Sequence, residues 1–126
     1  MRLFEKGIYG TLDKNVPKLI QKQMMEFMDG FCAKFRLKDF NDIDHWCAHP
    51  GGPAILKAVQ RALELDDKRL EHSWECLRNY GNMSSCTVLF ILESIMTHKE
   101  INTSDNMMIL AFGPGVWVKS LLLQKQ

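Results

Sequence analysis

The sequence predicts a mixed α/β domain, and three observations carry that prediction. Apolar residues recur at helical spacing along residues 16–28 and again along residues 54–63. A short apolar run, residues 45–48, precedes the second of these stretches across a turn rich in glycine and proline, which gives the order strand, loop and helix. Later in the chain, residues 107–112 and 116–123 form two strand-like runs on either side of a short turn.

The first helix is expected to begin near Val16. Asn15 is a suitable N-cap residue, and Pro17 is tolerated in the first turn, where N–H groups have no acceptor within the helix. The apolar positions fall on one side, so one face of this helix should be buried. These positions are Val16, Leu19, Ile20, Met24, Phe27 and Met28.

A buried strand and a second helix should follow, joined by a glycine corner. The strand His45–Ala48 stops at the turn 49–53, which contains two prolines and two glycines. Pro53 can open the helix because it has no N–H to satisfy at that position. The apolar stripe of this helix consists of Ala54, Ile55, Ala58, Val59, Ala62 and Leu63.

A third helix should run to about Asn79. Either Asp66 or Asp67 can cap its start, since a short carboxylate side chain accepts a hydrogen bond from a first-turn N–H. The segment Tyr80–Asn82 should end it, because the central glycine suits a left-handed C-terminal cap.

A fourth helix is expected after Ser84 or Ser85, either of which can cap it. Residues 86–96 are apolar on nearly every side, so this helix should be buried in a larger body. Its longest apolar run, Val88–Leu92, is far shorter than the ~20 residues of a membrane-spanning helix, so we do not expect an integral membrane protein. A polar connection, residues 98–106, leads to the two strands, which should pair as a hairpin in the middle of a sheet.

Composition narrows the class of protein. The chain has 126 residues, 46% of them hydrophobic, and no repeat or linker, so residues 1–126 should form a single domain. A net charge of +1 spread over scattered side chains argues against nucleic acid as the main ligand. Residues 1–10 contain no apolar core of a secretory signal. The cysteines lack the spacing of a disulfide framework or metal site, which predicts reduced thiols in a cytoplasmic protein without a metal; they are Cys32, Cys47, Cys76 and Cys86.

Two positions could carry chemistry. His49 stands where a buried strand meets a glycine corner and a helix start, so its imidazole and free helix N–H groups could hold a carbonyl or anionic oxygen. Asn82 stands between a helix ended by glycine and the cap of the next helix, where its amide could donate to a substrate oxygen. Each also has a structural interpretation: the histidine could bond a backbone carbonyl, and the asparagine could close a turn.

Four motifs taken together make the sequence recognisable. In order and spacing they resemble the C-terminal half of chalcone and stilbene synthases, the type III polyketide synthases, over nearly the whole chain. The pairing of the first two motifs is highly specific. The motifs are His-Pro-Gly-Gly-Pro-Ala-Ile-Leu at 49–56, Tyr-Gly-Asn-Met-Ser-Ser at 80–85, Val-Leu-Phe-Ile-Leu at 88–92 and Phe-Gly-Pro-Gly at 112–115.

The resemblance implies a thiolase-like fold, in which two α/β halves each supply a mixed five-stranded sheet covered by helices. This chain would be the C-terminal half of that αβαβα sandwich, with the N-terminal half missing, and the full-length family implies a homodimer. Family enzymes are acyltransferases that load an acyl group from a coenzyme A thioester, such as an aromatic acyl-CoA, onto a cysteine. They extend it by decarboxylative condensation with malonyl-CoA. No tightly bound cofactor is implied, because the coenzyme A thioesters are substrates.

The resemblance also implies residue roles. His49 and Asn82 would be two members of a Cys-His-Asn triad, His49 pairing with the thiolate and both donating to the thioester oxygen. The corner at Gly51, Gly52 and Ala54 would lie against the pantetheine arm of coenzyme A. The residues that would line or shape the cavity are Gly10, Ser84, Gly113, Pro114 and Gly115.

The chain departs from the family pattern in ways that leave an alternative open. The family's nucleophilic cysteine lies in the other half, and Cys47 is not expected to replace it, because it stands on a strand rather than at a helix start. We expect Lys57 and Arg78 to be solvated charges on helix faces rather than ligands of the coenzyme A phosphates. Gly10 falls where the family usually has phenylalanine, which implies a wider passage. The alternative is a non-catalytic remnant or a scaffold that binds a partner; a ketoacyl carrier protein synthase relative is disfavoured because Pro50 begins Pro-Gly-Gly where those enzymes have Gln-Ala-Asn.

Overall fold

The computed structural model describes residues 2–4, 7–9, 13–98, 100–113 and 117–126. The chain contains both helices and strands, as the sequence predicts. In chain order the elements are β1 (Arg2–Phe4), β2 (Gly7–Tyr9), α1 (Val16–Phe35), the 3-10 helix η1 (Phe40–Asp42), β3 (His45–Ala48), α2 (Pro53–Leu63), α3 (Glu71–Tyr80), the 3-10 helix η2 (Ser84–Cys86), α4 (Thr87–His98), β4 (Asn106–Gly113) and β5 (Trp117–Gln124).

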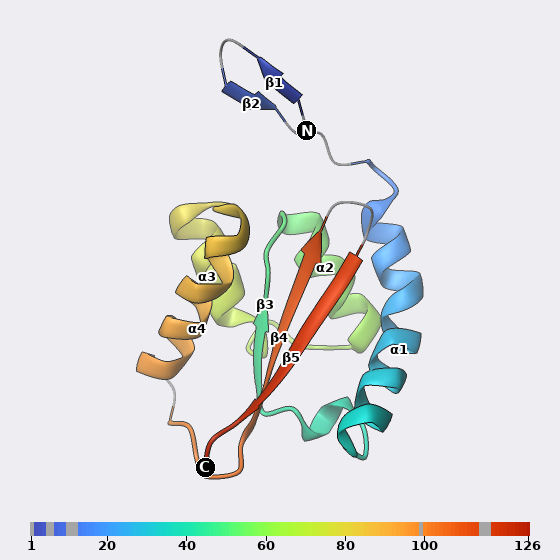
Figure 1. Cartoon of the computed structure of the whole chain (residues 1–126), viewed down its shortest axis with the longest axis vertical. Coiled ribbons are helices and arrows are strands. Elements are labelled where there is room, and N and C mark those ends of the chain that lie inside the picture. Colours follow the sequence, from blue (N-terminus) through green and yellow to red (C-terminus); the bar gives the residue numbers. More distant parts are fainter. Residues whose placement is uncertain (1, 5–6, 10–12, 99, 114–116) are drawn as a thin grey trace.

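A mixed sheet lies between two layers of helices (Figure 1). Its strand order is β3-β4-β5, with β3 parallel to β4 and β5 antiparallel to β4. Helices α1 and α2 cover one face, α4 lies on the other, and α3 packs beside the edge of β3 that β4 does not occupy, with side chains in both cores. Three α-helices and the 3-10 helix η2 lie between the two parallel strands, because parallel strands need a long crossover connection. The mixed α/β class is therefore confirmed.

The number of strands in the main sheet differs from the expected five. Among the residues that the structure describes, this sheet has three strands. The remaining strands, β1 and β2, pair only with each other as an antiparallel ribbon. Each is only three residues long, so the pair forms a short hairpin of its own.

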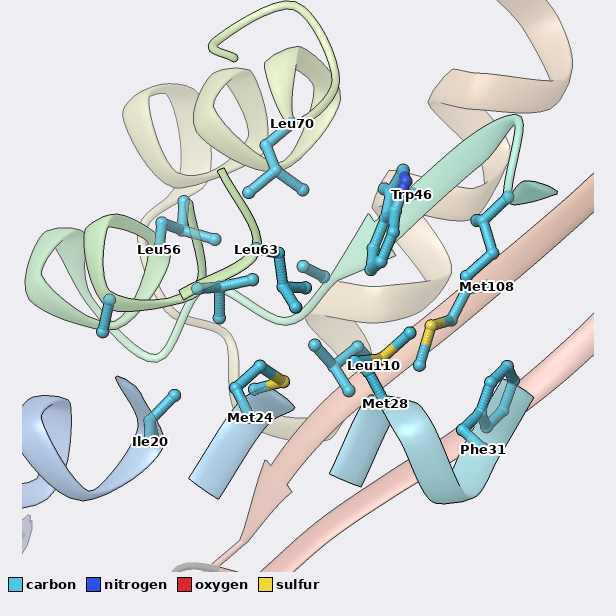
Figure 2. Close-up of a cluster of buried hydrophobic side chains, with 14 of the residues drawn as sticks. Ile20, Met24, Met28, Phe31, Trp46, Leu56, Leu63, Leu70, Met108 and Leu110 are labelled. Atoms are coloured by element: carbon cyan, nitrogen blue, oxygen red, sulfur yellow. The ribbon is translucent and has the colours of Figure 1, made fainter. Parts of the chain in front are cut away.

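The larger core lies between the sheet and the helices α1 and α2 (Figure 2). Because side chains alternate along a strand, Trp46 of β3 and the residues Met108 and Leu110 of β4 all point to this face. They meet Met24 and Met28 of α1, and all five side chains are almost fully buried.

A second, smaller core lies on the other face of the sheet. Cys47 of β3 and Met107 of β4 pack there against Ile91 and Ile95 of α4. This face is less completely covered, because β5 leaves its apolar side chains exposed over the same surface. These side chains are Trp117, Leu121 and Leu123.

Helix α4 is buried on one face within this chain, whereas its sequence predicts burial on nearly every side in a larger body. Thr87, Ile91 and Ile95 point inward, whereas Leu89 is 64% exposed and Met96 63% exposed. Within this chain the helix therefore covers the sheet with one side and presents a second apolar side to solvent. No helix in the described part of the chain combines the length and apolarity needed to cross a bilayer.

Two helix starts differ from expectation, whereas no end was predicted for α1. This helix continues to Phe35, and Phe31 and Cys32 prolong its buried stripe. Its N-terminus has no side-chain cap from Asn15. Helix α3 starts at Glu71, later than a cap at residue 66 or 67 predicts. Asp66 instead closes a turn before the helix, where its Oδ1 accepts from the backbone N–H of Arg69 at 2.9 Å.

Candidate functional site

The end of β3 is held from both sides just before His49. The backbone N–H of His49 donates to the carbonyl of Leu110 at 2.7 Å, which extends the pairing with β4 by one step. On the opposite edge, the N–H of Ala48 donates to the Oγ of Ser73 at 3.2 Å. Ser73 is fully buried on α3. The histidine therefore leaves the sheet from a fixed backbone.

The glycine corner turns the chain from β3 into α2. The N–H of Gly51 donates to the carbonyl of His49 at 3.1 Å, and the Gly52 carbonyl begins the helix by accepting from Ile55 N–H at 3.0 Å. A Cβ on Gly51 would stand 3.3 Å from Cγ1 of Ile55, closer than most side-chain contacts allow. Glycine at position 51 therefore permits the close approach of the corner to the first turn of α2.

Asn82 lies against this corner. Its Nδ2 donates to the carbonyl of Gly51 at 3.2 Å, and its Oδ1 accepts from the N–H of Ser84 at 2.8 Å. The preceding Gly81 has φ +72°, a left-handed value that glycine adopts without strain. The structure thus brings the loop carrying Asn82 onto the corner that follows His49, across 31 residues of sequence. An amide nitrogen has two N–H groups, so one remains for another acceptor.

The His49 side chain is nearly buried, with 8% of its surface exposed. Its Nδ1 is buried and has no hydrogen-bond partner within the described residues. Burial lowers the pKa of His49, because removing water disfavours the charged imidazolium. The imidazole of this chain is therefore neutral near pH 7, which is compatible with either a proton acceptor or a neutral donor.

The other predicted site residues lie on several elements of the structure. Gly52 forms the N-cap of α2 and Ala54 is exposed in its first turn. Ser84 is exposed, with a left-handed φ of 60°, and Gly113 is the exposed last residue of β4. Gly10, Pro114 and Gly115 lie outside the described residues.

None of the described features favours a thiolate nucleophile in this chain. Burial raises the pKa of Cys47 to about 12, and its Sγ donates to the Val88 carbonyl at 3.4 Å. Burial also raises the pKa of Cys32 and Cys76. Cys86 is exposed on η2. All four cysteines have free thiols.

Metal ligation has no support in the described ranges, where no group of three or more histidine, cysteine, aspartate and glutamate side chains could hold an ion. Sequence reasoning missed Ser73, which holds the backbone of β3 next to His49. Its only signal is a small polar side chain at an inward position of an amphipathic helix, between Leu70 and Leu77.

Comparison with known proteins identifies the family. The family described as "Chalcone and stilbene synthases, C-terminal domain" matches residues 1–126. The chain is 36% identical to type III polyketide synthase 21 of Oryza sativa subsp. japonica over 125 residues, which is 98% of this chain and 32% of that protein. It is also 36% identical to type III polyketide synthase A of Arabidopsis thaliana over 128 residues, again 98% of this chain and 32% of that protein.

Solved structures agree with the sequence comparison. The polyketide synthase PKS-I from the brown alga Ectocarpus siliculosus superposes with a TM-score of 0.86 at 32% identity, over 99% of this chain and 34% of that one. The C-terminal type III polyketide synthase domain of the Dictyostelium hybrid Steely1 gives a TM-score of 0.85 at 29% identity, over 98% of this chain and 35% of that one. The chain spans about a third of these proteins. It belongs to the chalcone and stilbene synthase family of type III polyketide synthases, as a C-terminal domain with the thiolase-like α/β fold.

Proposed function

We propose that this chain supplies the histidine and the asparagine of a Cys-His-Asn acyltransferase site. The reaction is the decarboxylative condensation of malonyl-CoA onto an aromatic acyl-CoA starter. One observation carries the proposal: the Asn82 amide bonds the Gly51 carbonyl at 3.2 Å and so shares one corner with His49. Coenzyme A thioesters are substrates of this reaction, and it needs no tightly bound cofactor.

The chemistry follows from two donors near one oxygen. When a thioester carbonyl becomes an enolate or a tetrahedral intermediate, negative charge develops on its oxygen, and fixed donors stabilise that charge. His49 would provide one N–H, and the second N–H of Asn82 would provide another. The cysteine thiolate would come from outside this chain and would pair with the imidazole of His49, which favours the thiolate form.

The surrounding residues would hold the substrate. Gly51, Gly52 and Ala54 would contact the pantetheine arm, because a corner with little side chain lets an extended ligand approach the backbone. The cavity that shapes the product would include Ser84 and the turn that begins at Gly113, together with Gly10, Pro114 and Gly115. The assembled enzyme would be a cytoplasmic homodimer, as the family resemblance implies.

The test compares the chain alone with the chain joined to an N-terminal half of a type III polyketide synthase that carries the cysteine. Radiolabelled malonyl-CoA and an aromatic acyl-CoA are supplied, and both protein-bound label and polyketide product are measured. The chain alone should give neither, and the joined protein should give product. In the joined protein, Asn82→Ala should lower kcat by about 10²–10³-fold, as expected for loss of an oxyanion donor.

Matched controls use exposed residues of the same type. Asn79→Ala on α3 and His98→Gln on α4 should leave the product yield unchanged, whereas His49→Gln should abolish it. A thioester on any cysteine of the isolated chain would contradict the assignment of the nucleophile to another segment. Full activity of Asn82→Ala would contradict the assignment of the oxyanion donor.

A second candidate is a non-catalytic remnant or scaffold that binds a partner synthase. The observation that favours it is the set of thiols, of which three have a raised pKa. This candidate predicts a stable complex with an N-terminal half but no product, whichever half is supplied.

A further inference from the structure

A cavity with several polar residues in its lining lies at the other end of β3 from His49. It has a volume of about 190 Å³ and is lined by Trp46 of β3, by Arg69 from the connection between α2 and α3, and by neighbouring polar side chains. The strand separates His45, at its start, from His49 by four residues, which is about 13 Å at the usual rise per residue. The cavity is therefore distinct from the corner where Asn82 meets Gly51.

Two residues of the cavity lining, Trp46 and Arg69, each have a buried N–H donor without a partner within the described residues. Trp46 is 2% exposed, and its indole Nε1 forms no hydrogen bond within the part of the chain that the structure describes. Figure 2 shows this nitrogen at the end of the ring that faces away from Leu63 and Leu110. The Nε of Arg69 is also buried and forms no hydrogen bond within the described residues. A buried donor without an acceptor costs about 1–3 kcal/mol, so an acceptor brought within reach of either N–H would be stabilised.

The positive charge of Arg69 is also left without a carboxylate. Its Nη2 donates to the neutral backbone carbonyl of Ile43 at 2.9 Å. Over the described ranges, neither Arg69 nor the adjacent Lys68, which also lines the cavity, forms a salt bridge. A guanidinium with a free Nε edge matches the paired oxygens of a carboxylate or phosphate.

The acidic side chains of the lining are already engaged by backbone donors. Asp66 accepts from the N–H of Arg69 at 2.9 Å, and Asp44 accepts from the N–H of Asn106 at 2.8 Å. His45 lies 3.0 Å from the Asp105 carboxylate, which lies outside the lining. Asp44 and Asp66 therefore each have a backbone donor and keep their negative charge, whereas Trp46 and Arg69 each have an N–H without an acceptor among the described residues.

We propose that this cavity binds a small oxyanion, a carboxylate or phosphate group, through the indole N–H of Trp46 and the guanidinium of Arg69. Lys68, an exposed residue of the lining, adds a second positive charge at the site. The volume suits a compact anion rather than an extended cofactor. Water is the competing occupant, since a polar cavity of this size also holds ordered water.

The test follows the indole N–H signals of the 126-residue chain by nuclear magnetic resonance. Spectra of Trp74→Phe and Trp117→Phe variants assign the Trp46 signal. Sodium phosphate and sodium acetate are titrated separately at constant ionic strength, with sodium chloride making up the balance. The Trp46 signal should shift and saturate with at least one of the two oxyanions, while the signals of Trp74 and Trp117 stay in place.

Substitutions then identify the cation. Arg69→Gln should weaken the oxyanion affinity at least about tenfold, since a charge-assisted hydrogen bond is lost. The matched control Arg61→Gln, on the exposed side of α2, should leave the affinity unchanged. If Arg69→Gln does not fold, the exposed Lys68→Gln provides the second variant and should weaken binding by a smaller factor.

Two outcomes would overturn the proposal. The first is a Trp46 signal that responds to neither oxyanion, or that moves equally with chloride alone, which would identify a water-filled cavity. The second is an affinity that Arg69→Gln in a folded protein leaves unchanged. Neither outcome depends on polyketide synthesis, so the anion site and the proposed acyltransferase function stand or fall separately.

Discussion

Replacing Ser73 with alanine tests how the chain holds the strand end that carries His49. The Ser73 Oγ accepts the hydrogen bond from the buried N–H of Ala48 at 3.2 Å. Alanine has nearly the same volume, so the change removes the acceptor without opening a large cavity. The N–H of Ala48 is then left unsatisfied, which costs about 1–3 kcal/mol. We therefore expect Ser73→Ala to lower the free energy of unfolding by about 2 kcal/mol, within that range.

Two measurements check this expectation. Urea unfolding followed by circular dichroism gives the loss of stability, and amide hydrogen exchange should show lower protection at Ala48 than in the unchanged chain. The matched control Ser85→Ala alters an exposed serine and should stay within about 0.5 kcal/mol. A Ser73→Ala protein with unchanged stability and unchanged exchange at Ala48 would refute the reasoning, because the bond would then contribute nothing.

Three further predictions concern other features of the chain. Burial lowers the pKa of His49, so the unfolded state binds a proton at this residue more readily than the folded state. The free energy of unfolding should therefore fall as the pH drops below about 6.5. His49→Gln should reduce this pH dependence, measured by urea unfolding at several pH values. In thiol labelling of the native protein by a chromogenic disulfide reagent, the exposed Cys86 should react first and the buried Cys47 last, and Cys86→Ser should remove the fast phase. The isolated chain should self-associate through the apolar face of β5, so Leu121→Lys, at a side chain 60% exposed, should shift sedimentation toward the monomer, whereas Leu19→Lys on α1 should not.

The secondary structure could be predicted where the pattern of apolar residues is local. The strand His45–Ala48, the helix from Pro53 and the paired runs of β4 and β5 were all predicted from spacing and turn residues. The start of α3 was wrong because Asp66 is chemically able to cap either a helix or a turn, and only the three-dimensional path of the chain decides which. Burial of α4 on nearly every side was expected within a larger body, and this chain supplies cover for one face of the helix.

The sequence names the candidate site residues, but it does not predict the contacts between them. The motifs at His49 and Asn82 single out both side chains, but the bond from Asn82 to the Gly51 carbonyl joins two loops whose meeting is decided by the packing of β3 and α3. Ser73 was missed for the same reason, since its partner is a backbone N–H on the edge of β3 that β4 does not occupy. A pattern of side chains contains no information on which backbone groups lack a partner.

In the proposed chemistry, the protonation state of His49 depends on a cysteine that this chain does not supply. Within the chain, burial lowers the pKa of His49 and favours the neutral imidazole. A cysteine thiolate placed beside the ring would favour the imidazolium instead, because an opposite charge stabilises the charged form. Each partner would then raise the charged population of the other, since a cationic histidine in turn lowers the pKa of a thiol. The ion pair is therefore expected only when both segments are assembled, and an imidazolium at His49 in the isolated chain at neutral pH would contradict the proposed division of the site.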